Sequence, residues 1–227
     1  MQQSSSTKVR LIATALIVLF GPALFYYLIT RGENKYKGLE KFGPRDFQMV
    51  NGKADTVYHT IGNFSLTDQK GKLVTPQNFN NKIYVANFFF TTCTSICPKM
   101  SEGIQDAAYA FKDDTLVKFI SHTVNPEEDS VPVLFAYSLK YHAKPDKWYF
   151  VTGDKEQIYK LAREDYYLPI APGNGGKDDF IHSEKLILID TSKRIRGIYD
   201  GTDAWEIARL KDEIKVLEYE CFGKVSK

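Results

Sequence analysis

Two cysteines spaced four residues apart are the residues of this sequence best suited to chemistry. Cys93 and Cys97 lie in the segment Cys-Thr-Ser-Ile-Cys-Pro, directly after the apolar run 83–90. That run is typical of a buried strand, and Pro98 is typical of the first turn of a helix. Unpaired N–H groups and the helix dipole at such a helix start favour thiolate over thiol. Because positions i and i+4 share one helix face, the two sulfurs can either bind one metal ion or form a disulfide.

Simple burial is the alternative explanation for any cysteine, because the free side chain packs as a small apolar group. We favour it for Cys221, which falls on the apolar stripe of the last predicted helix. Cys93 and Cys97 are two of only 3 cysteines in the chain and share one strand-to-helix junction. We therefore predict that this pair is reactive or metal-binding.

The composition is that of a globular protein with little net charge. Of the 227 residues, 43% are hydrophobic and 26% are charged, and the formal net charge is +2. The length fits one domain with extensions. The charge gives no reason to expect nucleic acid as a partner.

An uncharged apolar stretch over residues 11–30 is long enough to cross a membrane as a helix. A cleaved signal peptide usually has a shorter apolar core and a small-residue cleavage site, which residues 26–30 do not offer. We therefore predict a retained single-pass anchor.

The orientation of this anchor is a separate question. More Lys and Arg follow the stretch than precede it, which favours a cytoplasmic domain, but that rule is weak for long domains. Because a tethered thiol pair suits the outer face, we predict the periplasmic side of the inner (cytoplasmic) membrane, or the mitochondrial intermembrane space of a eukaryote.

The domain boundaries follow from changes in composition along the chain. We predict a short N-terminal tail over residues 1–10, the anchor over 11–30, and a polar tether with Gly and Pro over 31–56. The folded domain is expected over 57–222 and a C-terminal tail over 223–227.

Apolar periodicity within the domain predicts strands that alternate with helices. A hairpin over 64–74 comes first, and the closing helix begins near Asp203 with a stripe at Ile207, Leu210, Ile214 and Leu217. This order predicts an α/β domain that resembles the thioredoxin-like fold, with an extra N-terminal β-hairpin and one preceding transmembrane helix. The predicted strands are 83–90, 116–124, 148–151, 186–189 and 195–199, and the other helices follow Pro98, cover 131–142 and follow a cap at Asp154.

Five motifs in this order resemble the Sco/SenC family of membrane-anchored copper chaperones. The resemblance covers roughly residues 64–217. One departure is visible, because Asn125 stands where family members usually carry the first Asp of Asp-Pro-x-x-Asp-Thr-Pro. The motifs are Phe64-Ser65-Leu66-Thr67-Asp68, Cys93-x3-Cys97-Pro98, Asn125-Pro126-x2-Asp129-Ser130, Phe150-x-Thr152-Gly153 and Asp179-Phe180-Ile181-His182-Ser183.

The resemblance implies a copper site formed by Cys93, Cys97 and His182, with Cu(I) or Cu(II) as the bound ion. It implies an assembly factor, rather than a turnover enzyme, that delivers copper to the binuclear copper site of cytochrome c oxidase. The implied partners are the copper-site subunit of that oxidase, other copper chaperones and, through the N-terminal helix, the membrane.

The residue types are consistent with that implication. Thiolates suit Cu(I) or Zn(II), and imidazole suits copper in either state, whereas structural zinc usually takes four protein ligands. His182 precedes the strand 186–189, at a junction that faces the thiols in a thioredoxin-like topology. Its alternative role is that of a histidine satisfied at a strand edge. We expect structural roles for His59, His122 and His142, and a core position for Met100.

Two other functions are alternatives to copper delivery. A thiol–disulfide oxidoreductase acting outside the cytoplasm would use Cys93, the more exposed thiol, for attack and Cys97 for resolution. Thioredoxin-like oxidoreductases carry a C-x2-C motif and a proline just before the position equivalent to Leu186. This chain has neither. A peroxidase of the peroxiredoxin type needs a proline where Phe90 stands. Thiol–disulfide exchange can coexist with copper delivery, since a chaperone can also reduce the cysteines of its target.

Overall fold

The computed structural model describes residues 5–31, 38–50, 53–168 and 183–223, which belong to two separate units. The first unit contains helix α1 (Ser5–Arg31). Within α1, Val9–Tyr27 has a mean hydropathy of 2.0 and is long and apolar enough to cross a membrane. This range agrees with the predicted anchor.

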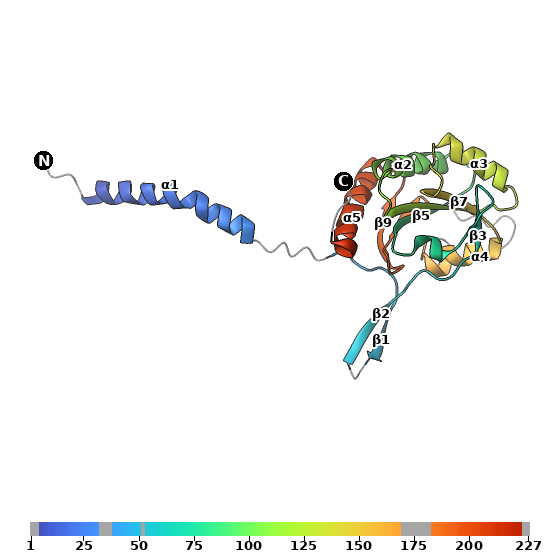
Figure 1. Cartoon of the computed structure of the whole chain (residues 1–227), viewed down its shortest axis with the longest axis horizontal. Helices are drawn as coiled ribbons and strands as arrows, with labels where there is room; N and C mark the ends of the chain where they lie inside the picture. Colours follow the sequence, from blue (N-terminus) through green and yellow to red (C-terminus); the bar gives the residue numbers. More distant parts are fainter. Residues whose placement is uncertain (1–4, 32–37, 51–52, 169–182, 224–227) are drawn as a thin grey trace. The chain divides into compact units, whose positions relative to one another are not determined.

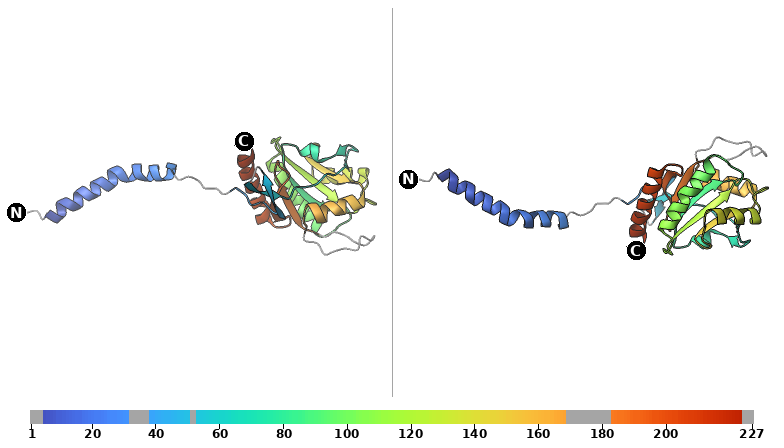
Figure 2. Two further views of the ribbon diagram at one scale, coloured as in Figure 1. Left: turned by 90° about the horizontal axis from the view of Figure 1, so that it is seen from below. Right: turned by 90° about the horizontal axis from the view of Figure 1, so that it is seen from above.

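The second unit is built on a seven-stranded sheet with the order β4-β3-β7-β6-β5-β8-β9 (Figures 1 and 2). The three central strands β5, β6 and β7 run parallel, and β3, β8 and β9 each pair antiparallel with a neighbour. The strands are β3 (Leu66–Asp68), β4 (Leu73–Val74), β5 (Ile83–Phe89), β6 (Val117–Thr123), β7 (Trp148–Thr152), β8 (Lys185–Ile189) and β9 (Ile195–Asp200).

Helices cover both faces of this sheet, so β5 is buried at every position. Residues of α2, α3 and α5 form one apolar core with the sheet, and residues of α4 and the turn after it form the other. Figure 1 shows α2 and α3 above the sheet and α4 below it. The helices are α2 (Ile96–Ala110), α3 (Val131–Lys140), α4 (Lys155–Lys160) and α5 (Ala204–Phe222), with short helical turns at Pro76–Phe79 and Leu161–Asp165.

The main predicted elements are confirmed, together with the thioredoxin-like α/β fold. The predicted hairpin is the antiparallel pair β3–β4. Asp154 caps α4 by accepting a hydrogen bond from the backbone N–H of Gln157, and Asp203 caps α5 through the N–H of Trp205, each at 2.8 Å.

A second hairpin lies where the sequence analysis predicted only a tether. Strands β1 (Arg45–Val50) and β2 (Lys53–Tyr58) pair antiparallel as a separate two-stranded sheet. The pattern of this segment hides the hairpin, because its apolar residues are exposed rather than turned to a core. The tether is therefore structured over this part, and the predicted domain start near residue 57 falls within β2.

Arg196 ties the entry of the chain to its C-terminal helix. The side chain is only 3% exposed. Nη1 donates to the Asp190 carboxylate at 3.0 Å, and Nη2 donates to Glu220 at 2.6 Å. The same guanidinium donates to the backbone carbonyls of Leu39 and Glu40 at 2.7 and 3.1 Å. A buried cation with all these partners is fully satisfied, which is the condition for such an ion pair to be tolerated.

Candidate metal and redox site

The cysteine pair lies in the connection between the central strand and the first helix of the domain. β5 ends at Phe89 and α2 begins at Ile96, so Cys93 belongs to the loop and Cys97 to the first turn of α2. The backbone N–H of Cys97 points to the Cys93 sulfur at a distance of 3.4 Å. As predicted, a helix-start N–H group is available to stabilise a thiolate.

The two sulfurs differ sharply in environment. Cys93 is half-buried, whereas Cys97 is 3% exposed. Partial burial acts to raise the pKa of Cys93, but hydrogen bonds from Cys97 and Ser95 outweigh it and lower the pKa to about 7. Burial, together with the adjacent Cys93, raises the pKa of Cys97 to about 12. At neutral pH Cys93 is therefore partly ionised to the thiolate, whereas the buried Cys97 stays protonated.

Asp129 holds the cysteine loop in place, a role that the sequence analysis did not assign. Its carboxylate is fully buried and accepts hydrogen bonds from the backbone N–H of Thr91 at 3.1 Å and from the hydroxyls of Thr91 and Thr123. The Asp129 N–H in turn donates to the carbonyl of Asn125 at 2.9 Å. The motif that contains Asn125 and Asp129 was visible in the sequence, but the partner threonines come from the loop after β5 and from the last position of β6.

His182, the third predicted ligand, lies outside the residues that the structure describes. Among those described, no group of three His, Cys, Asp or Glu side chains lies close enough to hold a metal ion. The strand that follows His182 is informative, however. β8 runs antiparallel to β5, with Ala86 opposite Ile187 and Tyr84 opposite Ile189. The start of β8 therefore lies toward the end of β5 that leads to Cys93.

The remaining candidate ligands have structural positions. Met100 is fully buried and receives a contact from the Asn87 amide at 3.7 Å, which confirms its core position. His122 is buried within β6, and the His59 ring contacts the Asp165 carbonyl at 2.9 Å. Cys221 is half-buried rather than fully buried, and it packs against the apolar core from the last turn of α5.

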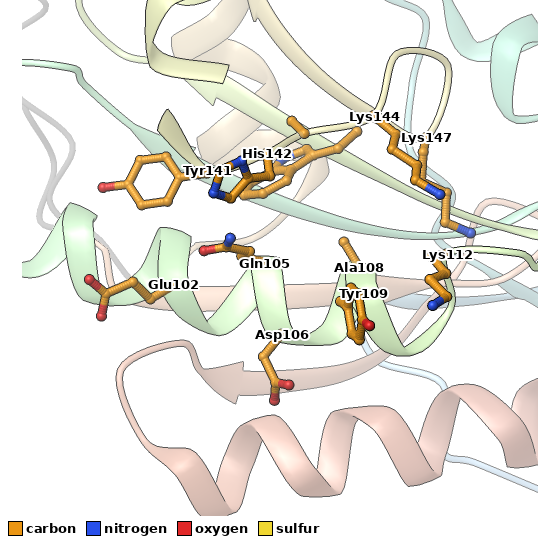
Figure 3. Close-up of a pocket in the computed structure, with 12 residues that line it drawn as sticks. Glu102, Gln105, Asp106, Ala108, Tyr109, Lys112, Tyr141, His142, Lys144 and Lys147 are labelled. Carbon is orange, nitrogen blue, oxygen red and sulfur yellow. The ribbon is translucent and has the colours of Figure 1, made fainter. Parts of the chain in front are cut away.

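A pocket of about 490 Å³ lies along α2 but away from the cysteines. It is formed by the later turns of α2 and by the connection between α3 and β7 (Figure 3). Lys112, Lys144 and Lys147 gather at one end of it, and Glu102 lies at the other (Figure 3). Neither Cys93 nor Cys97 lines this pocket, so it is separate from the thiol chemistry.

Fold and site together define a thioredoxin-like protein with an asymmetric thiol pair at its first strand-to-helix junction. The chain belongs to the SCO1/SenC family, whose model matches residues 52–217.

Solved structures of related proteins agree with this assignment. A SCO1/SenC family lipoprotein from Bacillus anthracis is 28% identical, with a TM-score of 0.62 over 70% of this chain and 95% of that one. BsSco, described as a member of the Sco family of cytochrome c oxidase assembly proteins and studied for a disulfide switch, is 25% identical, with a TM-score of 0.58 over 70% and 93%. Arabidopsis thaliana ScoI, solved with copper bound, is 27% identical, with a TM-score of 0.56 over 71% and 98%.

Proposed function

We propose that this chain is a membrane-anchored copper chaperone that delivers copper to the binuclear copper site of cytochrome c oxidase. Cys93, Cys97 and His182 are the proposed ligands, and the copper-site subunit of the oxidase is the proposed partner. The observation that carries the proposal is the Cys93 sulfur, half-exposed and supported by the helix-start N–H of Cys97. The relatives solved with copper and described as oxidase assembly proteins support the same function.

The thiol pair suits a cargo ion that must be both held and released. Cys93 offers a thiolate at neutral pH, because its pKa is lowered to about 7. Cys97 must lose its proton before it can bind, so copper binding at neutral pH releases that proton. Two soft thiolates favour Cu(I), and an added imidazole accommodates Cu(II) as well. Three protein ligands leave room for the incoming ligands of a partner.

The support for His182 is topological. The strand that it precedes begins near the end of β5, and the loop of Cys93 leaves from that same end. Ser183, the next residue, is buried, and its hydroxyl accepts the backbone N–H of Lys185 at 3.2 Å. The chain directly after His182 therefore enters β8, which pairs with β5, the strand that leads to the loop of Cys93.

Copper titration of the intact protein and its variants tests the ligand set. Cys93→Ser and Cys97→Ser should abolish tight binding of one copper per chain, and His182→Ala should weaken binding, most of all for Cu(II). Cys221→Ser is the matched thiol control. His142→Asn is the imidazole control, with Asn chosen because His142 has a φ of 52°. An unchanged stoichiometry and absorption spectrum in Cys93→Ser would contradict the proposal.

Thiol–disulfide exchange is a second function that the unequal thiols favour. The Cys93 thiolate would attack a target disulfide, and the released target sulfur would take a proton. The Cys97 sulfur would then attack Cys93, freeing the second target thiol and leaving a Cys93–Cys97 disulfide. The target gains two electrons and the pair loses two. Such a step would reduce the cysteines of the oxidase subunit before copper transfer.

Mass spectrometry of the air-oxidised, copper-free protein tests this second function. A Cys93–Cys97 disulfide is expected, and copper loaded beforehand should suppress it, because the same sulfurs are engaged. A bridge from Cys221 to either cysteine would show that the pairing is wrong. The Cys97→Ser variant should also trap a mixed disulfide between Cys93 and the oxidase subunit, whereas Cys93→Ser should trap none.

A further inference from the structure

The hairpin β1–β2 exposes an apolar surface that the copper site does not explain. Phe47 is 79% exposed and Met49 is 72% exposed. Figure 1 shows the hairpin projecting from the body of the domain. A two-stranded hairpin without a core is marginally stable in water. Two large apolar side chains on such an element therefore indicate a surface that becomes covered.

The register places these residues on one face together with a cation and a tyrosine. Arg45 pairs with Tyr58 at the base of the hairpin, and Phe47 and Met49 follow Arg45 at alternate positions of β1. Alternate residues of a strand point to the same face, and so do directly opposed residues. Asp46, the acidic residue of β1, falls on the opposite face.

Three cations converge on Tyr58 at the base of this face. Lys41 Nζ lies 4.5 Å from the ring centroid, and the guanidinium carbons of Arg45 and Arg194 each lie 5.5 Å from it. In the described part of the chain, none of the three forms an ion pair with a carboxylate. Nε of Arg194 is also buried without a hydrogen-bond partner. The base of the hairpin thus offers unneutralised positive charge.

We propose that this face of β1–β2 binds the surface of the membrane, with Phe47 and Met49 in the interfacial region and the three cations on lipid phosphates. Strand geometry places Phe47 about 7 Å beyond Arg45, and apolar faces at membrane surfaces sink about 5–10 Å. Tyrosine beside cations is typical of the headgroup level. The chain between the apolar part of α1 and Arg45, residues 28–44, spans at most about 60 Å, which keeps the hairpin within reach. The inference goes beyond copper delivery and does not depend on the metal.

Photo-crosslinking of the full chain in lipid vesicles tests this proposal. Phe47 is replaced by benzoylphenylalanine, and a matched protein carries the same group at Tyr109, an aromatic residue of α2 that is 69% exposed. Vesicles contain phosphatidylcholine alone or mixed with anionic phosphatidylglycerol. We expect lipid adducts at position 47 at about tenfold the yield at position 109, as follows from burying one aromatic side chain. Equal yields at the two positions would overturn the proposal.

A charge variant tests the role of the cations. Lys41→Gln, Arg45→Gln and Arg194→Gln together should lower the lipid adduct at position 47 about fivefold or more in anionic vesicles, with a smaller change in neutral ones. Circular dichroism and Cys93 alkylation verify that the fold persists. An adduct yield that is insensitive to the charges would overturn phosphate binding. Adducts to a second copy of the chain instead of lipid would make this face a dimer interface and would overturn membrane binding.

Discussion

At the scale of single residues, the chemistry depends on an inequality between two neighbouring sulfurs. Cys93 has a lowered pKa because Cys97 and Ser95 donate hydrogen bonds to its sulfur, and Cys97 has a raised pKa because it is buried. The spacing alone predicted that the sulfurs would meet and that Cys93 would be the more exposed. It could not predict the size of the difference, because burial is set by α2 packing on the sheet and not by the local sequence.

The titration of Cys93 should be visible in its reactivity. In a Cys221→Ser background that keeps Cys97, the rate of Cys93 alkylation by iodoacetamide, read by mass spectrometry, should rise with pH and reach half its maximum near pH 7, since only the thiolate reacts. Ser95→Ala should move that midpoint upward, because it removes the hydroxyl 3.8 Å from the sulfur. Ser65→Ala, an exposed serine elsewhere, should not. A midpoint near that of a free cysteine would contradict the lowered pKa.

His122 should make the protein sensitive to mild acid. Burial, only partly opposed by the Asn87 carbonyl, lowers the pKa of His122 from 6.5 to about 4. The ring stacks on Phe88 at 4.7 Å and its Nε2 has no hydrogen-bond partner. Below pH 6.5 the unfolded chain therefore binds a proton at this histidine, whereas the native state binds it only near pH 4. As the pH is lowered through this window, the free energy of unfolding should fall by up to about 3 kcal/mol.

Urea unfolding at several pH values measures that effect. The apolar variant His122→Phe should flatten the pH dependence in this window, because it removes the titrating group. If the wild-type protein and His122→Phe show the same slope, the acid sensitivity belongs to other groups.

At the scale of elements, the cysteine loop is defined by what surrounds it. Asp129 joins the end of β6 to the loop after β5 by accepting three hydrogen bonds from Thr91 and Thr123. Since parallel neighbours end at one edge of a sheet, these loops are forced together. The two threonines could not be assigned as partners from sequence, because they are 32 positions apart and neither lies in a recognisable motif.

Replacement of Asp129 should loosen the loop without removing a ligand. Asp129→Asn substitutes an NH2 group for one acceptor, so at least one buried donor loses its partner at a cost of about 1–3 kcal/mol. We expect lower stability in urea and weaker copper binding at unchanged stoichiometry. Asp113→Asn, an exposed change of the same kind, is the control. Wild-type copper affinity in a destabilised Asp129→Asn protein would show that Asp129 supports the fold alone.

The elements also show where sequence patterns stop being informative. Strands buried on both faces, such as β5, and helices with a stripe, such as α5, were predicted well because burial imposes a periodicity. β1 and β2 were not predicted, because their apolar residues face outward. These strands are defined only by their hydrogen-bonded pairing with each other. Cys221 keeps the period of the α5 stripe and packs against the core, although it is only half-buried.

At the scale of the whole molecule, the proposed function requires a particular side of the membrane. The apolar part of α1, Val9–Tyr27, is long enough to span a bilayer. The charges around it favour the opposite orientation, so the topology needs a direct measurement. If the thiol pair exchanges copper and disulfides with the oxidase as proposed, the domain is expected outside the cytoplasm.

A fusion of alkaline phosphatase to Lys227 should be active, because this enzyme forms its disulfides only in an oxidising compartment. Replacing it with a reporter that works only in the cytoplasm should give no signal. An expressed but inactive phosphatase fusion would place the domain in the cytoplasm. A cytosolic redox or metal-sensing function would then be the better proposal.

Arg196 has a mechanical consequence for a chain held by the proposed anchor. Any pull on the domain from its N-terminal side enters through Leu39 and Glu40, and Arg196 holds the carbonyls of both. Its links to Asp190 and Glu220 pass that load to the β8–β9 turn and to the last helix. A pull on the proposed anchor would thus load this edge of the sheet, opposite β3 and β4, before it reaches β5, the strand that leads to the cysteine loop.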